Sequence, residues 1–301
     1  MNDAVAIGVG AGFLGLVGLV AVAATASAAQ APVPAGVPSP VNDRANPTVT
    51  RPPTREASPG AAQPGRVSMA EARRVSWAIL SVFESGNPDG QYSAFAVLRD
   101  GAGISYGRKQ GTDESGTLDA IVSGYIQANG RYASQLRPYL PRLQANETVV
   151  LDPDPTTWPG WMHNLKQLLV AAGEDPVMHT VQNRVFDRLF WRPAVQAWQE
   201  LGLRSPLALA VVFDTSIHSG SPAAIGWVRR RFAVKPPREG GDEREWVRQY
   251  VLARRRWLAT HEKTALHATV YRMDAFLRLI DAGNWGLHTP IHITRPRATI
   301  R

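Results

Sequence analysis

A change in composition near residue 67 limits where this 301-residue chain can build a folded core. Residues 4–29 carry no charged side chain and consist almost entirely of Ala, Val, Gly, Leu and Ile. The next segment, residues 30–66, holds nine of the 23 prolines, a composition that cannot bury a core and favours an extended polyproline conformation. We therefore expect a folded domain at residues 67–301, preceded by an apolar segment at 1–29 and a disordered linker at 30–66.

The apolar segment has two readings. It is long enough to cross a bilayer as a helix, which indicates a membrane anchor through residues 4–29. Ala26-Ser27-Ala28 resembles a signal-peptidase site and favours a cleaved signal instead, although Met1-Asn2-Asp3 lacks the Lys or Arg that ordinary signals carry. Both readings allow an extracytoplasmic domain, membrane-anchored or secreted. The Arg residues that follow the apolar segment favour a cytoplasmic domain instead, because positive charges beside a membrane helix tend to stay on the cytoplasmic side.

Helical periodicity dominates from Ser68 onward. Ser68 and Glu71 have capping-box spacing, an apolar stripe follows, and Gly86 offers a stop. Residues 206–217 are apolar on all sides, which predicts a central buried helix. Further helices are expected over 116–128, 160–172, 177–190, 193–201, 242–260 and 265–281. Strand character is limited to 92–98 and 104–106, so we predict a mainly α (α+β) domain with one small β-hairpin.

Composition and motif spacing exclude several chemistries. The absence of Cys removes disulfides, thiol nucleophiles and Cys-ligated metals. A GxGxxG sequence at residues 10–15 runs into the proline tract rather than a second strand, so it predicts no cofactor site. His261 and His267 are six residues apart, not the four of a zinc helix, and no metal is expected.

The net charge of the chain is +8, which favours an anionic partner. Residues 68–301 hold 29 Lys and Arg against 22 Asp and Glu, a net charge of +7. The runs Arg229-Arg230-Arg231 and Arg254-Arg255-Arg256 invite a nucleic-acid interpretation. Three consecutive residues of a helix point in three directions, however, so these runs form no single row along a groove, and nucleic acid is not the expected partner.

Two carboxyl residues stand in contrasting surroundings. Glu84 ends the first helix of the domain, where the negative end of the helix dipole disfavours a second anion and suits a carboxyl that holds a proton. Asp100 follows sixteen residues later in a glycine turn that favours the ionised form. Two such carboxyls fit the hydrolysis of a glycosidic bond. A Glu at a helix end and an Asp in a glycine turn are, however, commonplace as solvated surface groups, and the pattern alone favours that interpretation.

Several motifs in order resemble the catalytic region of glycoside hydrolase family 46, the chitosanases of the lysozyme-like superfamily. The similarity covers roughly residues 68–292. Its motifs are Phe83-Glu84, Gln91-Tyr92, Asp100-Gly101-x-Gly103 with Ser105 and Gly107, Ser115-Gly116, Phe213-Asp214-x-x-Ile217-His218-Ser219-Gly220, Gly240-Gly241-Asp242-Glu243, Arg254 and Gly283-Asn284. This resemblance implies a lysozyme-like, two-lobed helical domain.

The resemblance also implies site residues. Glu84 matches the general acid, Asp100 the general base that activates water, and Ser105 a residue that positions this water. Family 46 enzymes invert the anomeric configuration, so their two carboxyls stand about 6.5–9.5 Å apart and admit a water molecule. Asp214 and Arg254 match a buried charged pair that supports the acid, although an internal salt bridge serving only the fold has the same pattern.

Substrate recognition departs from the family pattern. An Arg and a Tyr that many members carry in the glycine turn are Ala102 and Ile104 here, and an Asp that recognises the glucosamine ammonium is Thr117. Tyr92, Thr117 and His218 are the candidate substrate-binding residues. A basic domain suits an anionic glycan such as peptidoglycan better than polycationic chitosan.

The resulting hypothesis is an inverting endo-glycoside hydrolase that cleaves β-1,4 linkages of an amino-sugar polysaccharide and needs no cofactor. Chitosan and bacterial peptidoglycan remain open as its substrate. The alternative is a non-catalytic cell-wall glycan-binding module on a membrane-anchored stalk. An apolar segment and a linker suit a wall-facing domain of a bacterium or a virion.

Overall fold

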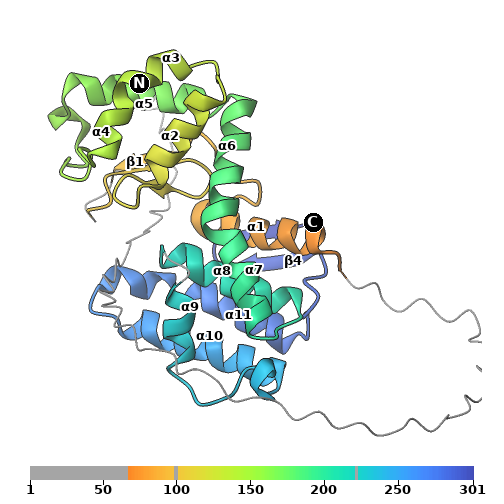
Figure 1. Cartoon of the computed structure of the whole chain (residues 1–301). Coiled ribbons are helices and arrows are strands. Elements are labelled where there is room, and N and C mark those ends of the chain that lie inside the picture. The colour runs from red at the N-terminus through yellow and green to blue at the C-terminus, as the bar shows by residue number, and fades with distance from the viewer. Residues whose placement is uncertain (1–66, 98–100, 221–222) are drawn as a thin grey trace, which may run out of the picture. The chain divides into compact units, whose positions relative to one another are not determined.

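The computed structural model describes residues 67–97, 101–220 and 223–301, which form helices and two small antiparallel sheets (Figure 1). The predicted mainly α fold with a small β element is confirmed. The apolar segment at 4–29 and the linker at 30–66 lie outside the described residues, and the interpretations given for them stay predictions. Across the described part of the chain, no helix combines the length and apolar character that crossing a membrane requires.

Helix α1, Met69–Ser85, begins and ends where its sequence predicts. Ser68 Oγ accepts the backbone N–H of Glu71 at 3.1 Å. Gly86 adopts the left-handed conformation (φ 73°) and donates its N–H back into the last turn. A side chain would be strained at this φ, so glycine permits the abrupt end. The second half of α1 is buried as far as Glu84, which brings a carboxyl group into the protein interior.

A first group of helices surrounds a three-stranded antiparallel sheet of order β1-β2-β3, one strand more than predicted. Its elements are β1, Phe95–Val97; β2, Ile104–Tyr106; β3, Gly111–Thr112; α2, Thr117–Gln127; α3, Ala133–Leu136; α4, Leu140–Gln144; and α5, Gly160–Ala172. Helix α2 contacts β3 and the short helices α3 and α4. The latter two are too short to show a periodic pattern, and the sequence did not predict them.

A second group of helices forms around α8. Its elements are α7, Arg192–Glu200; α8, Pro206–His218; α9, Ala223–Arg229; α10, Glu243–Thr260; and α11, Tyr271–Asp281. Every residue of α8 from Leu207 to His218 is buried, because α1, α7, α9, α10 and α11 all contact it. The prediction of a central apolar helix is confirmed.

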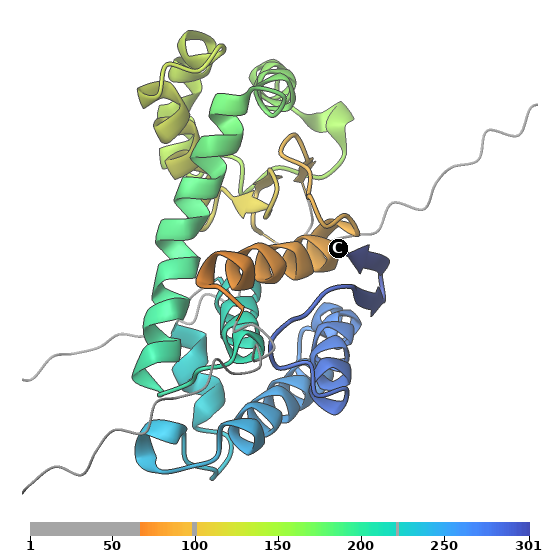
Figure 2. The ribbon, with the colours of Figure 1, turned by 90° about the vertical axis from the view of Figure 1, so that its right-hand side faces the viewer.

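A continuous helical segment joins the two groups. Helix α6, Pro176–Phe186, leads through a π-helical turn, Asp187–Trp191, directly into α7 (Figure 2). Helix α6 contacts α2 of the first group, and α7 contacts α8 of the second. The sequence predicted two separate helices here. The structure joins them, and Pro193 lies in the first turn of α7, where a helix tolerates proline.

The end of the domain differs from the prediction, which gave only helix beyond the first hairpin. Strands β4, Ile291–Thr294, and β5, Arg297–Ile300, form a second hairpin. Ile291 and Ile293 are buried while the residues between and after them are exposed, the alternation of a half-buried strand. Four residues are too few for this alternation to stand out in a sequence. Strand β5 contacts α1.

Phe213 offers a test of the α8 core. Its ring is fully buried, with ring centroids 6.0 Å from Trp77 of α1 and 4.9 Å from Trp191. We expect Phe213→Ala to lower the free energy of unfolding by about 3–5 kcal/mol, because it leaves a cavity between three elements. Urea unfolding measures this change. Val150→Ala, at an 87% exposed position, is the control and should stay within about 0.5 kcal/mol of the parent. Equal losses in both variants would contradict this account of the core.

Candidate active site

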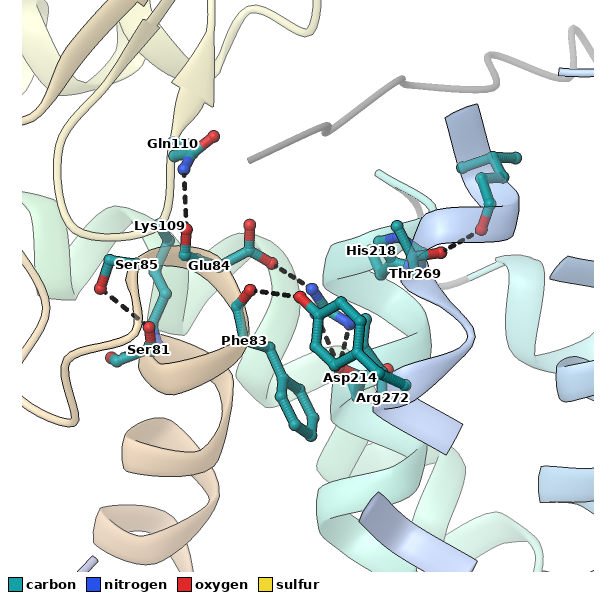
Figure 3. Close-up of polar contacts among 12 residues, drawn as sticks. Ser81, Phe83, Glu84, Ser85, Lys109, Gln110, Asp214, His218, Thr269 and Arg272 are labelled. Atoms are coloured by element: carbon teal, nitrogen blue, oxygen red, sulfur yellow. Dashed lines mark hydrogen bonds and ion pairs between the residues drawn. The ribbon is translucent and has the colours of Figure 1, made fainter. Parts of the chain in front are cut away.

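The last turn of α1 is fixed by side chains from distant elements. The final carbonyls of a helix lack partners within the helix and require others. Tyr271 Oη of α11 donates to Phe83 O at 2.7 Å, and Gln110 Nε2, from the loop between β2 and β3, donates to Glu84 O at 3.3 Å. The backbone that carries the Glu84 carboxyl is thus held from both helix groups (Figure 3).

The Glu84 carboxyl forms a buried ion-pair chain with Arg272 and Asp214. Arg272 Nη1 of α11 donates to Glu84 Oε1 at 2.8 Å, and its Nε and Nη2 donate to Asp214 Oδ1 of α8 at 3.0 and 2.7 Å. At most 2% of each side chain is exposed. Figure 3 shows the guanidinium between the two carboxyls. One positive charge therefore faces two acidic groups in the protein interior.

The electrostatics keep Arg272 charged. Burial by itself lowers the pKa of this guanidinium, but Asp214 and Glu84 outweigh burial and raise the pKa of Arg272 above its ordinary value. Among the described residues, the Glu84 carboxyl accepts from Arg272 Nη1 through Oε1, and no hydrogen bond joins Oε2. The carboxyl is therefore oriented through one of its two oxygens.

The observed partner of Asp214 corrects the expected pairing. The sequence resemblance gave Arg254, but Arg272 makes the hydrogen bonds, and Arg254 Nη2 of α10 donates instead to His218 Nδ1 at 3.1 Å. Arg254 stays buried, and its Nε and Nη1 have no hydrogen-bond partner in the described part of the chain. The sequence reasoning missed Arg272. A signal for it existed, because Arg272 shares the apolar face of its helix with Phe276, four residues later.

His218 is a buried, neutral imidazole. Because Arg254 can only donate, His218 Nδ1 accepts and the ring proton lies on Nε2. Burial is the main cause that depresses the pKa of His218, and the positive charges of Arg272 and Arg254 depress it further. With 3% of the residue exposed, His218 supports the Arg254 side chain in this conformation. Its predicted contact with substrate stays a prediction.

Lys109 is a third buried basic side chain, after Arg272 and Arg254, and the sequence reasoning missed its burial. Its Nζ donates to Trp77 O at 2.8 Å and to Ser81 Oγ at 2.7 Å. Both acceptors lie on α1, in the two turns that precede Glu84. Burial is the main cause that lowers the pKa of Lys109 well below its ordinary value. Nothing in the local sequence distinguishes this Lys from a solvated one, since its burial depends on where the loop folds.

The first helix group carries the other predicted residues. Asp100 lies outside the described residues, so its distance from Glu84 and its role as general base stay predictions. Ser105 is buried on β2, paired with Ala96 and Thr112 of the neighbouring strands. The structure does not test whether Ser105 holds a water molecule.

Tyr92 and Thr117 are built into the domain differently. The Tyr92 ring stacks on His179 of α6 with a centroid distance of 3.9 Å, and its hydroxyl accepts from Arg108 Nη1 at 3.1 Å. Thr117 opens α2 and is 97% buried, and its Oγ1 accepts from Ser115 Oγ at 2.9 Å. Thr117 is thus covered by protein in this conformation, whereas Tyr92 is half-exposed.

Comparisons of this chain with known proteins point to one family. The model of glycosyl hydrolase family 46 matches residues 78–291. A chitosanase of Bacillus subtilis (strain 168) is 28% identical over 74% of this chain and 82% of its own length. A chitosanase of Streptomyces sp. (strain N174) is 25% identical over 73% of this chain and 77% of its own length.

Solved structures agree. A family 46 chitosanase of Gynuella sunshinyii in complex with chitotetraose has a TM-score of 0.68 at 28% identity, and covers 78% of this chain and 99% of its own. The native chitosanase of Bacillus subtilis MY002 has a TM-score of 0.67 at 25% identity and covers 76% of this chain and 98% of its own. The family resemblance expected from the motifs is confirmed.

Removal of Arg272 should be strongly destabilising. Arg272→Met leaves the acidic groups of Asp214 and Glu84 buried without a counter-charge, so we expect the free energy of unfolding to fall by about 3–5 kcal/mol. Urea unfolding at pH 7 measures this loss. The matched control is Arg255→Met, which breaks the solvent-exposed pair with Asp274 and should lose at most about 1 kcal/mol. Similar losses in both variants would contradict a central role for the buried chain.

The neutral state of His218 predicts a pH dependence of stability. Below the ordinary pKa of 6.5 the unfolded chain binds a proton that buried His218 does not, so the free energy of unfolding falls as the pH falls. His218→Gln lacks this contribution and should lose less stability than the parent between pH 7 and pH 5. The measurement is urea unfolding across this range. The exposed His288→Gln should keep the parent's slope, and a parental slope in His218→Gln would exclude the neutral buried state.

Proposed function

The chain belongs to glycosyl hydrolase family 46 and is a glycoside hydrolase; we propose that it cleaves the β-1,4 linkages of chitosan, with Glu84 as the general acid. The observation that carries this proposal is the state of the Glu84 carboxyl. It is buried at the end of α1 and bonded through Oε1 to Arg272, and no hydrogen bond among the described residues joins Oε2. A proton donor requires this combination of a fixed orientation and one available oxygen.

The proposed reaction is a single displacement with inversion. Glu84 gives its proton to the glycosidic oxygen as the bond from that oxygen to the anomeric carbon breaks. Asp100 accepts a proton from a water molecule whose oxygen forms the new bond to the anomeric carbon on the opposite face. Arg272 then faces a carboxylate rather than a carboxylic acid at Glu84, and its positive charge stabilises this product state.

Chitosan is proposed because relatives that cover most of the chain are chitosanases, and one solved relative holds chitotetraose. Peptidoglycan is the second candidate, and a specific observation favours it. The domain carries a net charge of +7 over residues 68–301, which attracts an anionic glycan and repels a polycation. The position at which many family members place an Asp for the glucosamine ammonium holds Thr117, a neutral and buried residue.

The N-terminal segments belong to the proposal as a means of display. We propose that residues 4–29 anchor the chain in a membrane or direct its export, and that the proline-rich linker at 30–66 holds the domain away from that surface. At about 3.1 Å per residue, an extended linker of this length reaches on the order of 100 Å. A domain presented in this way suits a polymeric substrate outside the cytoplasm.

Substitution of the two carboxyls tests the catalytic assignment. We expect Glu84→Gln and Asp100→Asn each to reduce the release of reducing ends from chitosan by about 100-fold or more, because each removes one proton transfer. Peptidoglycan is assayed in parallel with the same full-length protein. The control is Glu71→Gln, an exposed carboxylate on the same helix, which should retain parental activity.

The outcomes separate the remaining alternatives. If the parent binds a glycan but releases no reducing ends, the chain is a binding module and the enzymatic proposal fails. The anomeric form of the first product, followed by proton NMR, tests the mechanism. A β-linked substrate should release the α-anomer initially, and initial release of the β-anomer would exclude inversion.

A further inference from the structure

A basic cavity lies beside the proposed site and has no role in it so far. It measures about 330 Å³, is open to solvent, and is lined by α11, by the 3-10 turn that precedes it (Thr264–Thr269) and by the turn of the β4-β5 hairpin. This volume is at the lower end of ligand pockets, enough for a small group such as part of a sugar residue. Its polar lining residues are His267, Tyr271, Asp274, Arg278, Thr294 and Arg295.

Two contacts connect this cavity to the end of α1. Tyr271 forms part of the cavity wall, and its hydroxyl donates to Phe83 O, one residue before Glu84. On the hairpin side, Pro296 follows the lining residue Arg295. Its Cβ lies 3.7 Å from the point that a Cβ added to Gly86 would occupy. Figure 2 shows the hairpin next to the C-terminal end of α1. Both contacts place walls of the cavity against residues that flank Glu84.

The charge of the lining is positive and uncompensated. Arg278 and Arg295 are exposed, and neither pairs with a carboxylate within the described part of the chain. The one acidic lining residue, Asp274, is bonded to Arg255 Nε at 2.6 Å, so its charge is already neutralised. His267 Nε2 is bonded to the backbone oxygen of His261 and leaves Nδ1 unbonded. Two guanidinium groups thus remain available for a ligand.

We propose that this cavity binds a carboxylate carried by a sugar unit near the bond that is cleaved, through Arg278 and Arg295. The planar guanidinium matches a carboxylate with paired hydrogen bonds, and the exposed Thr294 offers a hydroxyl to the sugar itself. The inference rests on the proposed function, because it assumes that the glycan chain passes Glu84. It extends that function to amino-sugar polymers that carry acidic substituents.

Carboxymethylated chitosan and unmodified chitosan of the same chain length provide the test. The full-length Arg278→Gln/Arg295→Gln variant should lose about tenfold in kcat/KM on the carboxymethylated polymer, because charged hydrogen bonds are removed. Its kcat/KM on unmodified chitosan should stay within about twofold of the parent, since that polymer has no carboxylate. The control is Arg230→Gln/Arg256→Gln, which removes the same charge from arginines outside the cavity lining and should change neither value.

Each result has one meaning. Equal effects on both polymers, or a loss as large in the control pair, would overturn the carboxylate site. A parent that hydrolyses neither polymer would instead contradict the proposed function, which keeps the two failures distinct. Thermal melting of each variant shows whether folding is intact. Peptidoglycan, whose carboxylates belong to lactyl and peptide groups, serves as a third substrate. A tenfold loss there as well would support a general carboxylate site.

Discussion

The buried bridge from Glu84 through Arg272 to Asp214 is the interaction on which the site depends. Its three members come from α1, α8 and α11, so it forms only when all three helices are in place. Removing charges from water is unfavourable unless good geometry and opposite charge offset that loss. Arg272 bonds to one oxygen of each acidic group, and the orientation of the reactive carboxyl is therefore a consequence of how the helices pack.

The sequence predicted correctly those features that neighbouring residues determine. Ser68 and Gly86 delimit α1, and the apolar run after Ser205 identified the central helix, because caps and all-round apolar character are properties of neighbouring residues. The position of Glu84 in the last turn of α1 follows from the two caps of this helix. Partner choice is another matter: Arg254 and Arg272 both lie on helices that pack near Asp214, and only the three-dimensional packing selects Arg272.

The burial of Lys109 and the short strands of the last hairpin could not be predicted from the sequence, because both depend on contacts with distant residues. Lys109 becomes buried because its loop folds over α1, which no pattern of neighbouring residues encodes. The four-residue strands of the last hairpin are stabilised by contact with α1 rather than by their own periodicity. Both features lie close to the end of α1, so the surroundings of Glu84 were less predictable than Glu84 itself.

The π-helical turn between α6 and α7 affects how one continuous helical segment packs against both helix groups. An extra residue in one turn rotates every later side chain by about 100° around the helix axis relative to an uninterrupted α-helix. The apolar face of α6 is thereby directed at α2, while that of α7 is directed at α8. This change of phase lets one continuous helical segment contact both helix groups, and deletion of one residue within Asp187–Trp191 would turn the α7 face away from α8.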